Sequence, residues 1–157
     1  MHKWCIVSIF WVCCIAFVYA QTSKEELLRK KVFNLGKDGV ALEGYDVTTY
    51  FTGKPQKGSK AFFYSYKGVR YLFSSAQNAA LFKANPAGYE PAYGGWCAYA
   101  MGTKGEKVEV DRENYKIEEG KLLLFYKGYF SNTLDDWNKD PLHLHQKADV
   151  NWAGFLK

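Results

Sequence analysis

The chain has 157 residues, of which 48% are hydrophobic and 18% aromatic, enough for one domain to stand on its own core. Its formal charge of +5 is mild, and no basic run is longer than Arg29–Lys31, which argues against a nucleic-acid-binding or membrane-surface protein. The sequence shows no repeat, linker or low-complexity segment that would divide it.

Residues 1–20 have the plan of a secretory signal peptide. A short start with Lys3 precedes an apolar stretch and the small-residue ending Val18–Ala20, which is typical of a cleavage site. The apolar stretch is short for a membrane-spanning helix, and a retained N-terminal anchor is the alternative. We therefore expect an exported protein, periplasmic or extracellular, that has no contact with the membrane after cleavage.

Cleavage would change the cysteine count. Three of the four cysteines, Cys5, Cys13 and Cys14, lie in the first 20 residues, so only Cys97 would remain. A chain with one cysteine can form no internal disulfide, and its core alone must stabilise it. Cleavage would also remove Lys3 and no acidic residue, so the charge would fall from +5 to +4.

The first predicted elements are a helix and a short β-segment. Helix-forming composition predicts a leading helix over Thr22–Lys31. Val32–Leu35 and Val40–Leu42 flank a Gly-Lys-Asp-Gly turn, which predicts a small hairpin or the entry to one. Asp46 follows and is expected to cap a brief helical turn over Val47–Phe51.

The clearest hairpin of the sequence comes next. Ala61–Tyr66 and Val69–Phe73 alternate in polarity across the turn Lys67–Gly68. A helix should then begin near Ser74, whose hydroxyl precedes a Gln by three residues, the spacing of a capping box. It should end before Asn85–Pro86, because the residue before a proline is pushed out of the α region.

The remaining sequence predicts further strands and two helices. Strands are expected over Lys107–Val110 and within Tyr115–Tyr126, with turns at Asp111–Asn114 and at Glu118–Lys121. The strand after the second turn, Leu122–Tyr126, is too hydrophobic for an edge. Ser131 or Asn132 can cap a short helix, and Asp140–Pro141 opens another through Ala148. Together these elements predict a single small α+β domain of antiparallel β-hairpins packed with short helices.

Several ordered motifs resemble the YHS domain family. The family pattern corresponds to Tyr71–Ser75, then Phe82, Asn85–Pro86 and Tyr89, and the run Tyr93–Tyr99 resembles the GGYCAY signature of exported members. Gly44–Val47 and Ala148–Trp152 also match, so the resemblance spans about Val40 to Trp152. With the signal peptide predicted over residues 1–20, it divides the rest of the chain into an N-terminal helix and leader over 21–39 and a YHS-like domain over 40–157.

The resemblance also implies a link to metals. YHS domains accompany copper transporters and other heavy-metal proteins, and a cysteine pair in the motif is their proposed metal site. In this chain the two positions correspond to Ser74 and Asn78, and neither side chain is a thiolate that would suit a soft metal. Copper is thus a cofactor by analogy only.

The residues themselves offer a second candidate metal site. Cys97 and Met101 are four residues apart, so on a helix both sulfur atoms would lie along one side, and a nearby imidazole would complete a site for Cu(I). His143 and His145 are the histidines that could supply it, although on a helix they lie on different faces. The opposing interpretation is that Cys97 is a buried, inert side chain and the histidines are surface residues.

A small-ligand site is predicted in the segment around the two adjacent glycines. Tyr93, Gly94, Gly95, Trp96 and Tyr99 combine glycines, which allow close approach of the backbone, with aromatic side chains that can line a pocket. The same tyrosines can instead be core residues whose hydroxyl groups reach the surface.

Three classes of function stay open at this point. The first is a non-catalytic binding module for a metal ion or a small ligand. The second is a thiol-dependent enzyme or redox protein that uses Cys97. The third is a structural or interaction protein without small-molecule chemistry, for which the sequence identifies no protein partner.

Overall fold

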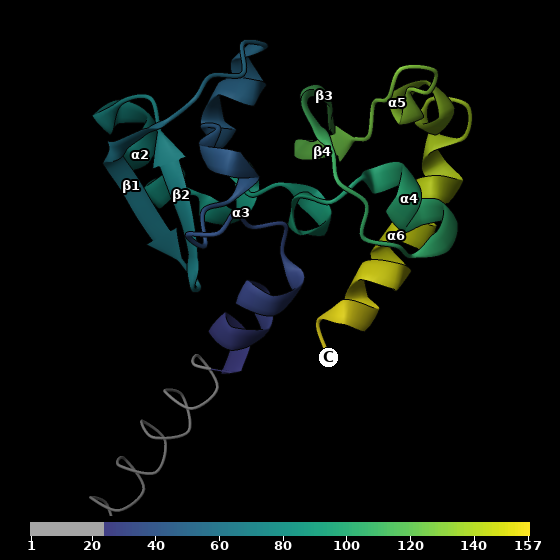
Figure 1. The fold of residues 1–157 in the computed structure, drawn as a ribbon, viewed down its shortest axis with the longest axis horizontal. Coiled ribbons are helices and arrows are strands. Elements are labelled where there is room, and N and C mark those ends of the chain that lie inside the picture. Colours follow the sequence, from purple (N-terminus) through teal and green to yellow (C-terminus); the bar gives the residue numbers. More distant parts are fainter. Residues whose placement is uncertain (1–23) are drawn as a thin grey trace, which may run out of the picture.

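A computed structural model describes residues 24–157, and the predicted signal peptide lies outside them. The fold is a single small α+β domain with two antiparallel two-stranded hairpins and several short helices (Figure 1). Residues 24–32 form the leading helix. The other helices are η1 (Leu42–Gly44), η2 (Val47–Thr52), α2 (Ala76–Ala84), α3 (Pro86–Tyr89), η3 (Ala92–Gly95), α4 (Ala98–Lys104), α5 (Thr133–Trp137) and α6 (Pro141–Phe155). None of the helices within residues 24–157 has the length and apolar character to span a membrane.

The first hairpin confirms the prediction. Strands β1 (Ser59–Tyr66) and β2 (Val69–Phe73) pair antiparallel across Lys67 and Gly68, which have φ angles of 47° and 80°. Two consecutive positive φ angles define the turn whose twist matches a two-residue hairpin. Along β2 the residues Val69, Tyr71 and Phe73 are fully buried, so this strand supplies one face to the core.

The segments on either side of this hairpin follow their local signals. Asp46 caps η2 by accepting the amide of Thr48 at 3.0 Å, as expected. Ser75, one residue later than the predicted cap, accepts the amide of Asn78 at 3.1 Å and starts α2, which ends at Asn85. The expected leader hairpin is reduced to one bridge between residues 35 and 41, because residue 40 pairs instead with Arg70 of β2.

The second hairpin, β3 (Asp111–Glu118) and β4 (Lys121–Phe125), corrects the sequence prediction. Asp111–Asn114 is not a turn but the first half of β3, and Lys107–Val110 is not a strand. The pairing shifts register between Asp111 and Tyr115. Such an irregularity lets polar, turn-forming residues stay within a strand, since the bulged residues leave the hydrogen-bonding ladder.

Strand β4 lies between two hydrophobic clusters. Leu122 and Leu124 contact the cluster that includes β2 and α2, whereas Leu123 and Phe125 contact the cluster that includes α4 and α6. Successive side chains of a strand point to opposite faces, so one apolar strand serves both clusters. Its free edge is covered by parallel bridges to Pro91 and Cys97, which agrees with the prediction that it is too hydrophobic for an edge.

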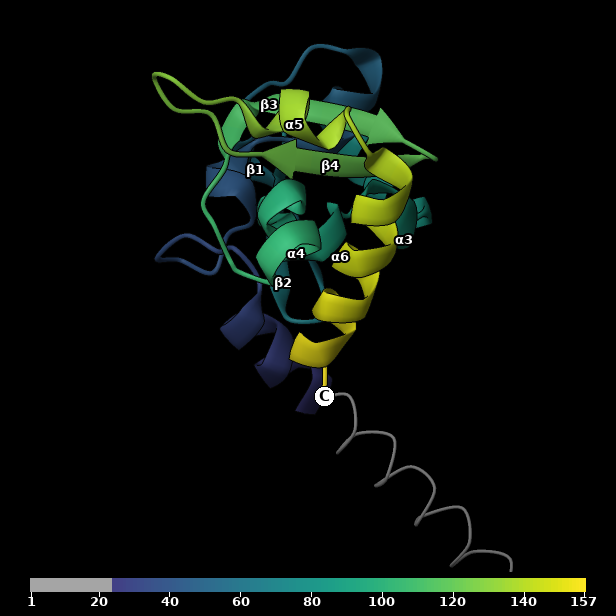
Figure 2. The same ribbon diagram turned by 90° about the vertical axis from the view of Figure 1, so that its right-hand side faces the viewer.

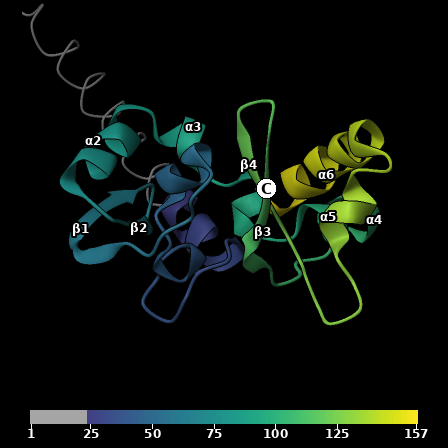
Figure 3. The same ribbon diagram turned by 90° about the horizontal axis from the view of Figure 1, so that it is seen from above.

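The views from other sides show how the elements surround this strand. Helices α4 and α6 pack against each other below β4 (Figure 2). Seen from above, the first hairpin with α2 lies on one side of the second hairpin, and α5 with α6 lies on the other (Figure 3). Helix α6 continues to Phe155, well past the predicted end near Ala148.

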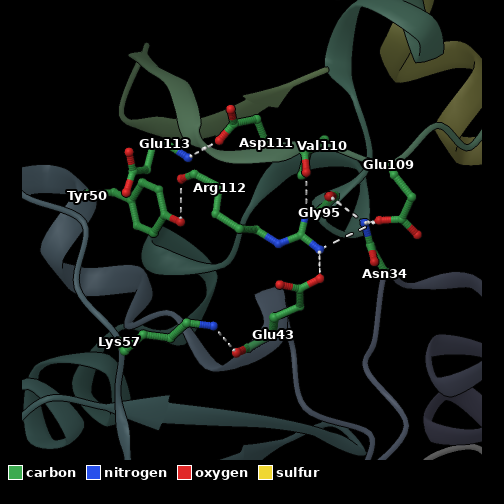
Figure 4. A network of polar contacts seen from close by, with 10 residues as sticks. All are labelled: Asn34, Glu43, Tyr50, Lys57, Gly95, Glu109, Val110, Asp111, Arg112 and Glu113. Atoms are coloured by element: carbon green, nitrogen blue, oxygen red, sulfur yellow. Dashed lines mark hydrogen bonds and ion pairs between the residues drawn. The ribbon is translucent and has the colours of Figure 1, made fainter. Parts of the chain in front are cut away.

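A polar network joins the two sides (Figure 4). The buried Arg112 of β3 donates to Glu43 Oε1 at 3.0 Å, and its carbonyl accepts the hydroxyl of Tyr50 at 2.9 Å. Asn34 donates to Glu109 Oε2 at 3.0 Å close by. These hydrogen bonds tie the segment before the first hairpin to β3 and to the residues just before it.

Candidate functional site

The thiol of Cys97 lies in the protein interior. Cys97 precedes α4 and is completely inaccessible to solvent, and its Sγ atom accepts the amide of Tyr126 and lies beside Thr133 Oγ1, both at 3.4 Å. Met101, one turn further on in α4, is equally enclosed. Cys97 is thus the residue that caps α4 rather than part of the helix, and both sulfur-bearing side chains are buried in the protein interior.

The two predicted histidine ligands lie on different faces of α6. His143 is exposed, and its Nδ1 lies 3.2 Å from Asp140 Oδ2. His145 lies between two carboxylates, with Nδ1 3.6 Å from Glu118 Oε1 and Nε2 3.8 Å from Asp149 Oδ2. Among residues 24–157 no three metal-binding side chains come together, so the structure does not gather Cys97 with these histidines into one centre.

The aromatic-glycine segment divides into two parts. Tyr93 and Gly94 line a cavity, whereas Trp96 donates its indole N–H to the carbonyl of Val32 at 2.7 Å and anchors the segment to the leading helix. Gly95 is buried, and its carbonyl accepts the side chain of Asn34. Tyr99 is half-buried on α4 and is not part of the cavity lining.

The cavity lies between η3 and α6 and has a volume of about 340 Å³. Aromatic and ionisable side chains from distant parts of the chain share its wall. The main ones are Arg29, Phe33, Glu90, Tyr93, Lys121, His145, Asp149 and Trp152. His145 and Asp149 also border a neighbouring hollow of about 450 Å³ beside Glu118, so these two side chains stand between two open spaces.

Gly94 is required for the shape of this wall. Its φ angle is +60°, and a Cβ atom placed there would lie 2.7 Å from Trp152 Cη2 and 3.0 Å from Phe33 Cγ. Only glycine permits both the backbone conformation and the close approach of the two rings. The rings themselves lie 5.6 Å apart at 57°, an edge-tilted packing that holds Trp152 at the cavity.

A chain of polar contacts runs along the α6 side of the cavity. Tyr93 donates its hydroxyl to Asp149 Oδ1 at 3.1 Å. Burial, and after it the Asp149 carboxylate, raises the pKa of Tyr93 far above its ordinary value, so the hydroxyl stays protonated and remains a donor. Asp149 in turn faces His145, which places an imidazole and a carboxylate side by side at the cavity.

Glu118 completes this chain beyond His145. Partial burial alone would raise the pKa of Glu118, but the Lys116 ammonium, the hydrogen bond from Trp137 and the neighbouring imidazole of His145 outweigh it and lower the pKa. Trp137 Nε1 donates to Glu118 Oε1 at 3.2 Å. Glu118 is therefore an ionised carboxylate that holds one edge of the imidazole while Asp149 faces the other.

The opposite wall is fixed by paired charges. Arg29 pairs with Glu90, which also accepts the hydroxyl of Tyr71, and the guanidinium lies 4.2 Å above the ring of Phe33. Burial, and after it Glu90, raises the pKa of Tyr71, so this hydroxyl too is a permanent donor. Because Arg29, Glu90 and Tyr71 satisfy one another, these three groups leave no unpaired charge. The ammonium of Lys121, which also lines the cavity, donates to the carbonyl of Ala87 at 3.1 Å.

The positions that the YHS resemblance assigns to metal-binding cysteines have another role. Ser74 and Asn78 both donate to Oδ2 of Asp46, which is completely buried. Oδ2 accepts the Ser74 amide at 2.8 Å, the Ser74 hydroxyl at 2.9 Å and the Asn78 amide group at 2.8 Å, while Oδ1 accepts Thr48. A hydroxyl and an amide committed to a carboxylate do not fit a soft metal.

Comparisons with known proteins assign neither a family nor a function to the chain. No protein-family model matches the chain, and neither the curated proteins nor the solved structures gave a match. The YHS resemblance therefore rests on the sequence motifs alone.

Sequence reasoning found part of this site. It named Tyr93 and Gly94 as ligand-binding residues and His145 as a metal ligand, but did not name Asp149 or Trp152 as site residues. His145 and Asp149 are four residues apart and Trp152 follows seven after His145, a spacing that places all three along one side of a helix. If the sequence prediction had extended this helix beyond Ala148, it would have placed these three residues on one side of the helix.

Proposed function

We propose that the protein is an exported, non-catalytic binding module for a small organic ligand, held in the cavity between η3 and α6. The observation that supports this most directly is the set of groups on the cavity wall: the rings of Tyr93 and Trp152 beside the polar pair His145 and Asp149. Aromatic rings beside polar groups that can fix the orientation of a ligand are common features of a small-molecule site.

The volume of the cavity and the pairing of its charged side chains narrow the range of ligands that would fit. About 340 Å³ is near the lower end of ligand pockets, which suits a molecule of metabolite size. Arg29 and Glu90 neutralise each other, so Asp149 is the carboxylate left to accept a hydrogen bond. An amine on an apolar or aromatic body satisfies both features, since Asp149 would bind the ammonium and Trp152 the body.

Two ligand classes were expected from the sequence, a metal ion and a small molecule. The structure gives more support to a small molecule in the cavity than to a metal ion at Cys97. Cys97 is enclosed by Tyr126 and Thr133 and is not part of the cavity lining. A metal or thiol function would require this interior side chain to become accessible, whereas ligand binding uses groups that already face open space.

The test is saturation-transfer NMR with a panel of aromatic amine fragments and their neutral isosteres. We expect amines to bind more strongly than isosteres, and both Asp149→Asn and His145→Gln to weaken amine binding. His143→Gln is the matched control, because His143 lies on the same helix but is not part of the cavity lining. Absence of binding by the whole panel, or an equal loss in His143→Gln and His145→Gln, would refute the proposal.

A further inference from the structure

A second open space carries an excess of positive charge that the linear sequence does not show. This hollow of about 540 Å³ lies between the leading helix, the 36–39 turn and β2. Four basic side chains line it, and one acidic side chain does. They are Lys30, Lys31, Lys37 and Arg70, with Asp38.

Backbone pairing brings these charges together. The amide of Arg70 donates to the carbonyl of Gly39 at 3.2 Å, and the amide of Ala41 donates to the carbonyl of Arg70 at 2.9 Å. These bonds hold the turn that carries Lys37 against β2. The helix that carries Lys30 is held by the hairpin turn, where Glu26 packs on Gly68.

The four basic side chains are free of carboxylate partners. Within residues 24–157 none of them takes part in an ion pair, while the nearby Arg29 and Lys67 each do. Even Asp38, which lines the same hollow, lies beyond ion-pair distance of them. Like charges in one hollow repel, and an anion placed among them removes this repulsion.

Arg70 is the residue best prepared for such a ligand. Its guanidinium carbon lies 4.2 Å from the centre of the Phe63 ring, a cation–π contact that restrains the group. Its Nε atom is buried and has no hydrogen-bond partner, and no hydrogen bond described for residues 24–157 uses the guanidinium. A planar, oriented guanidinium recognises oxyanions through paired hydrogen bonds.

We propose that this hollow binds a small molecule that carries phosphate or sulfate groups, with Arg70 as the orienting residue and Lys30, Lys31 and Lys37 as the neutralising charges. The hollow of about 540 Å³ has room for more than one tetrahedral oxyanion, so it can admit a ligand with two such groups. This site is separate from the amine site proposed above, since the two linings share only Phe33.

The test is calorimetric titration of the protein with inorganic pyrophosphate and with inorganic sulfate at constant ionic strength. We expect saturable binding, with pyrophosphate the tighter ligand. Arg70→Gln should weaken pyrophosphate binding by about tenfold or more, because it removes charge-assisted hydrogen bonds. Lys147→Gln, which removes the same charge from an exposed position on α6, should change affinity by less than about twofold.

A second variant keeps the proposal testable if Arg70→Gln does not fold. Lys37 is exposed, so Lys37→Gln should fold normally and still weaken pyrophosphate binding. Absence of saturable binding, or equal losses in Lys37→Gln and Lys147→Gln, would overturn the proposal. Vesicles of phosphatidylcholine with and without phosphatidylglycerol form a parallel arm. Arg70-dependent binding to the anionic vesicles without binding of pyrophosphate would overturn the assignment to a small molecule.

Discussion

Substitution of Asp46 by asparagine is the sharpest test of the role of Ser74 and Asn78 as hydrogen-bond donors to a buried carboxylate. Asparagine has the shape of aspartate, but one of its two terminal groups donates hydrogen bonds. In the wild-type protein Oδ1 accepts the Thr48 amide and Oδ2 accepts the Ser74 amide. Whichever way the new side chain turns, its NH₂ group faces one of these backbone amides and leaves it without an acceptor.

The expected loss in the free energy of unfolding follows from the backbone amide that is left without an acceptor. An unsatisfied buried N–H costs about 1–3 kcal/mol, and the remaining donors lose the strength that a charged acceptor gives them. Asp46→Asn should therefore lower the free energy of unfolding by about 3–5 kcal/mol. Ser74→Ala, which removes one of the five donors, should cost only about 0.5–1.5 kcal/mol.

The assay is urea unfolding followed by tryptophan fluorescence, with the slope checked for constancy. Asp135→Asn is the control, because Asp135 is exposed and should change stability by less than about 0.5 kcal/mol. A cost below about 1 kcal/mol for Asp46→Asn would show that the carboxylate does not hold this cluster. A cost for Ser74→Ala equal to that of Asp46→Asn would contradict the division among donors.

Three further predictions concern the cavity wall, the thiol and the acid limb of stability. Gly94→Ala should lower the free energy of unfolding in urea by about 2–4 kcal/mol, because the new Cβ atom would clash with Trp152. The control Gly39→Ala should lower it by about 1 kcal/mol, since Gly39 has a similar φ of +69° but no neighbour within 4 Å. Equal losses in the two variants would contradict the clash. Cys97 should resist alkylation near neutral pH until urea unfolds the protein, and rapid labelling of the native state would refute its enclosure. Because the folded-state pKa of Glu118 lies below its ordinary value of 4.5, its contribution is present above that pH and is lost as the pH falls through the folded pKa. The stability difference between wild type and Glu118→Gln should therefore shrink on acidification, and a difference that grows would show the opposite shift.

Local signals predicted much of the fold because they act over a few residues. The Lys67–Gly68 turn, the cap at Asp46 and the stop at Asn85–Pro86 each appear where expected. The failure at Asp111–Asn114 has a clear cause. Polar residues with turn propensity are retained in β3 by a register shift and by pairing with β4, which is a tertiary effect.

The candidate sites depended on contacts that sequence spacing cannot give. Tyr93 and Asp149 are 56 residues apart, and Arg70 and Lys37 line one hollow because the backbone of β2 pairs with residues 39–41. The cysteine was prominent in the sequence because it is chemically reactive as a residue type. The structure instead encloses Cys97 in the core, where burial rather than chemistry accounts for its position.

The most direct measurement is a crystal structure of the protein soaked with the tightest-binding aromatic amine. We expect electron density between η3 and α6, with the amine within hydrogen-bond distance of Asp149 and the ring beside Trp152. Density for the amine elsewhere, with this cavity filled only by water, would contradict the proposed function.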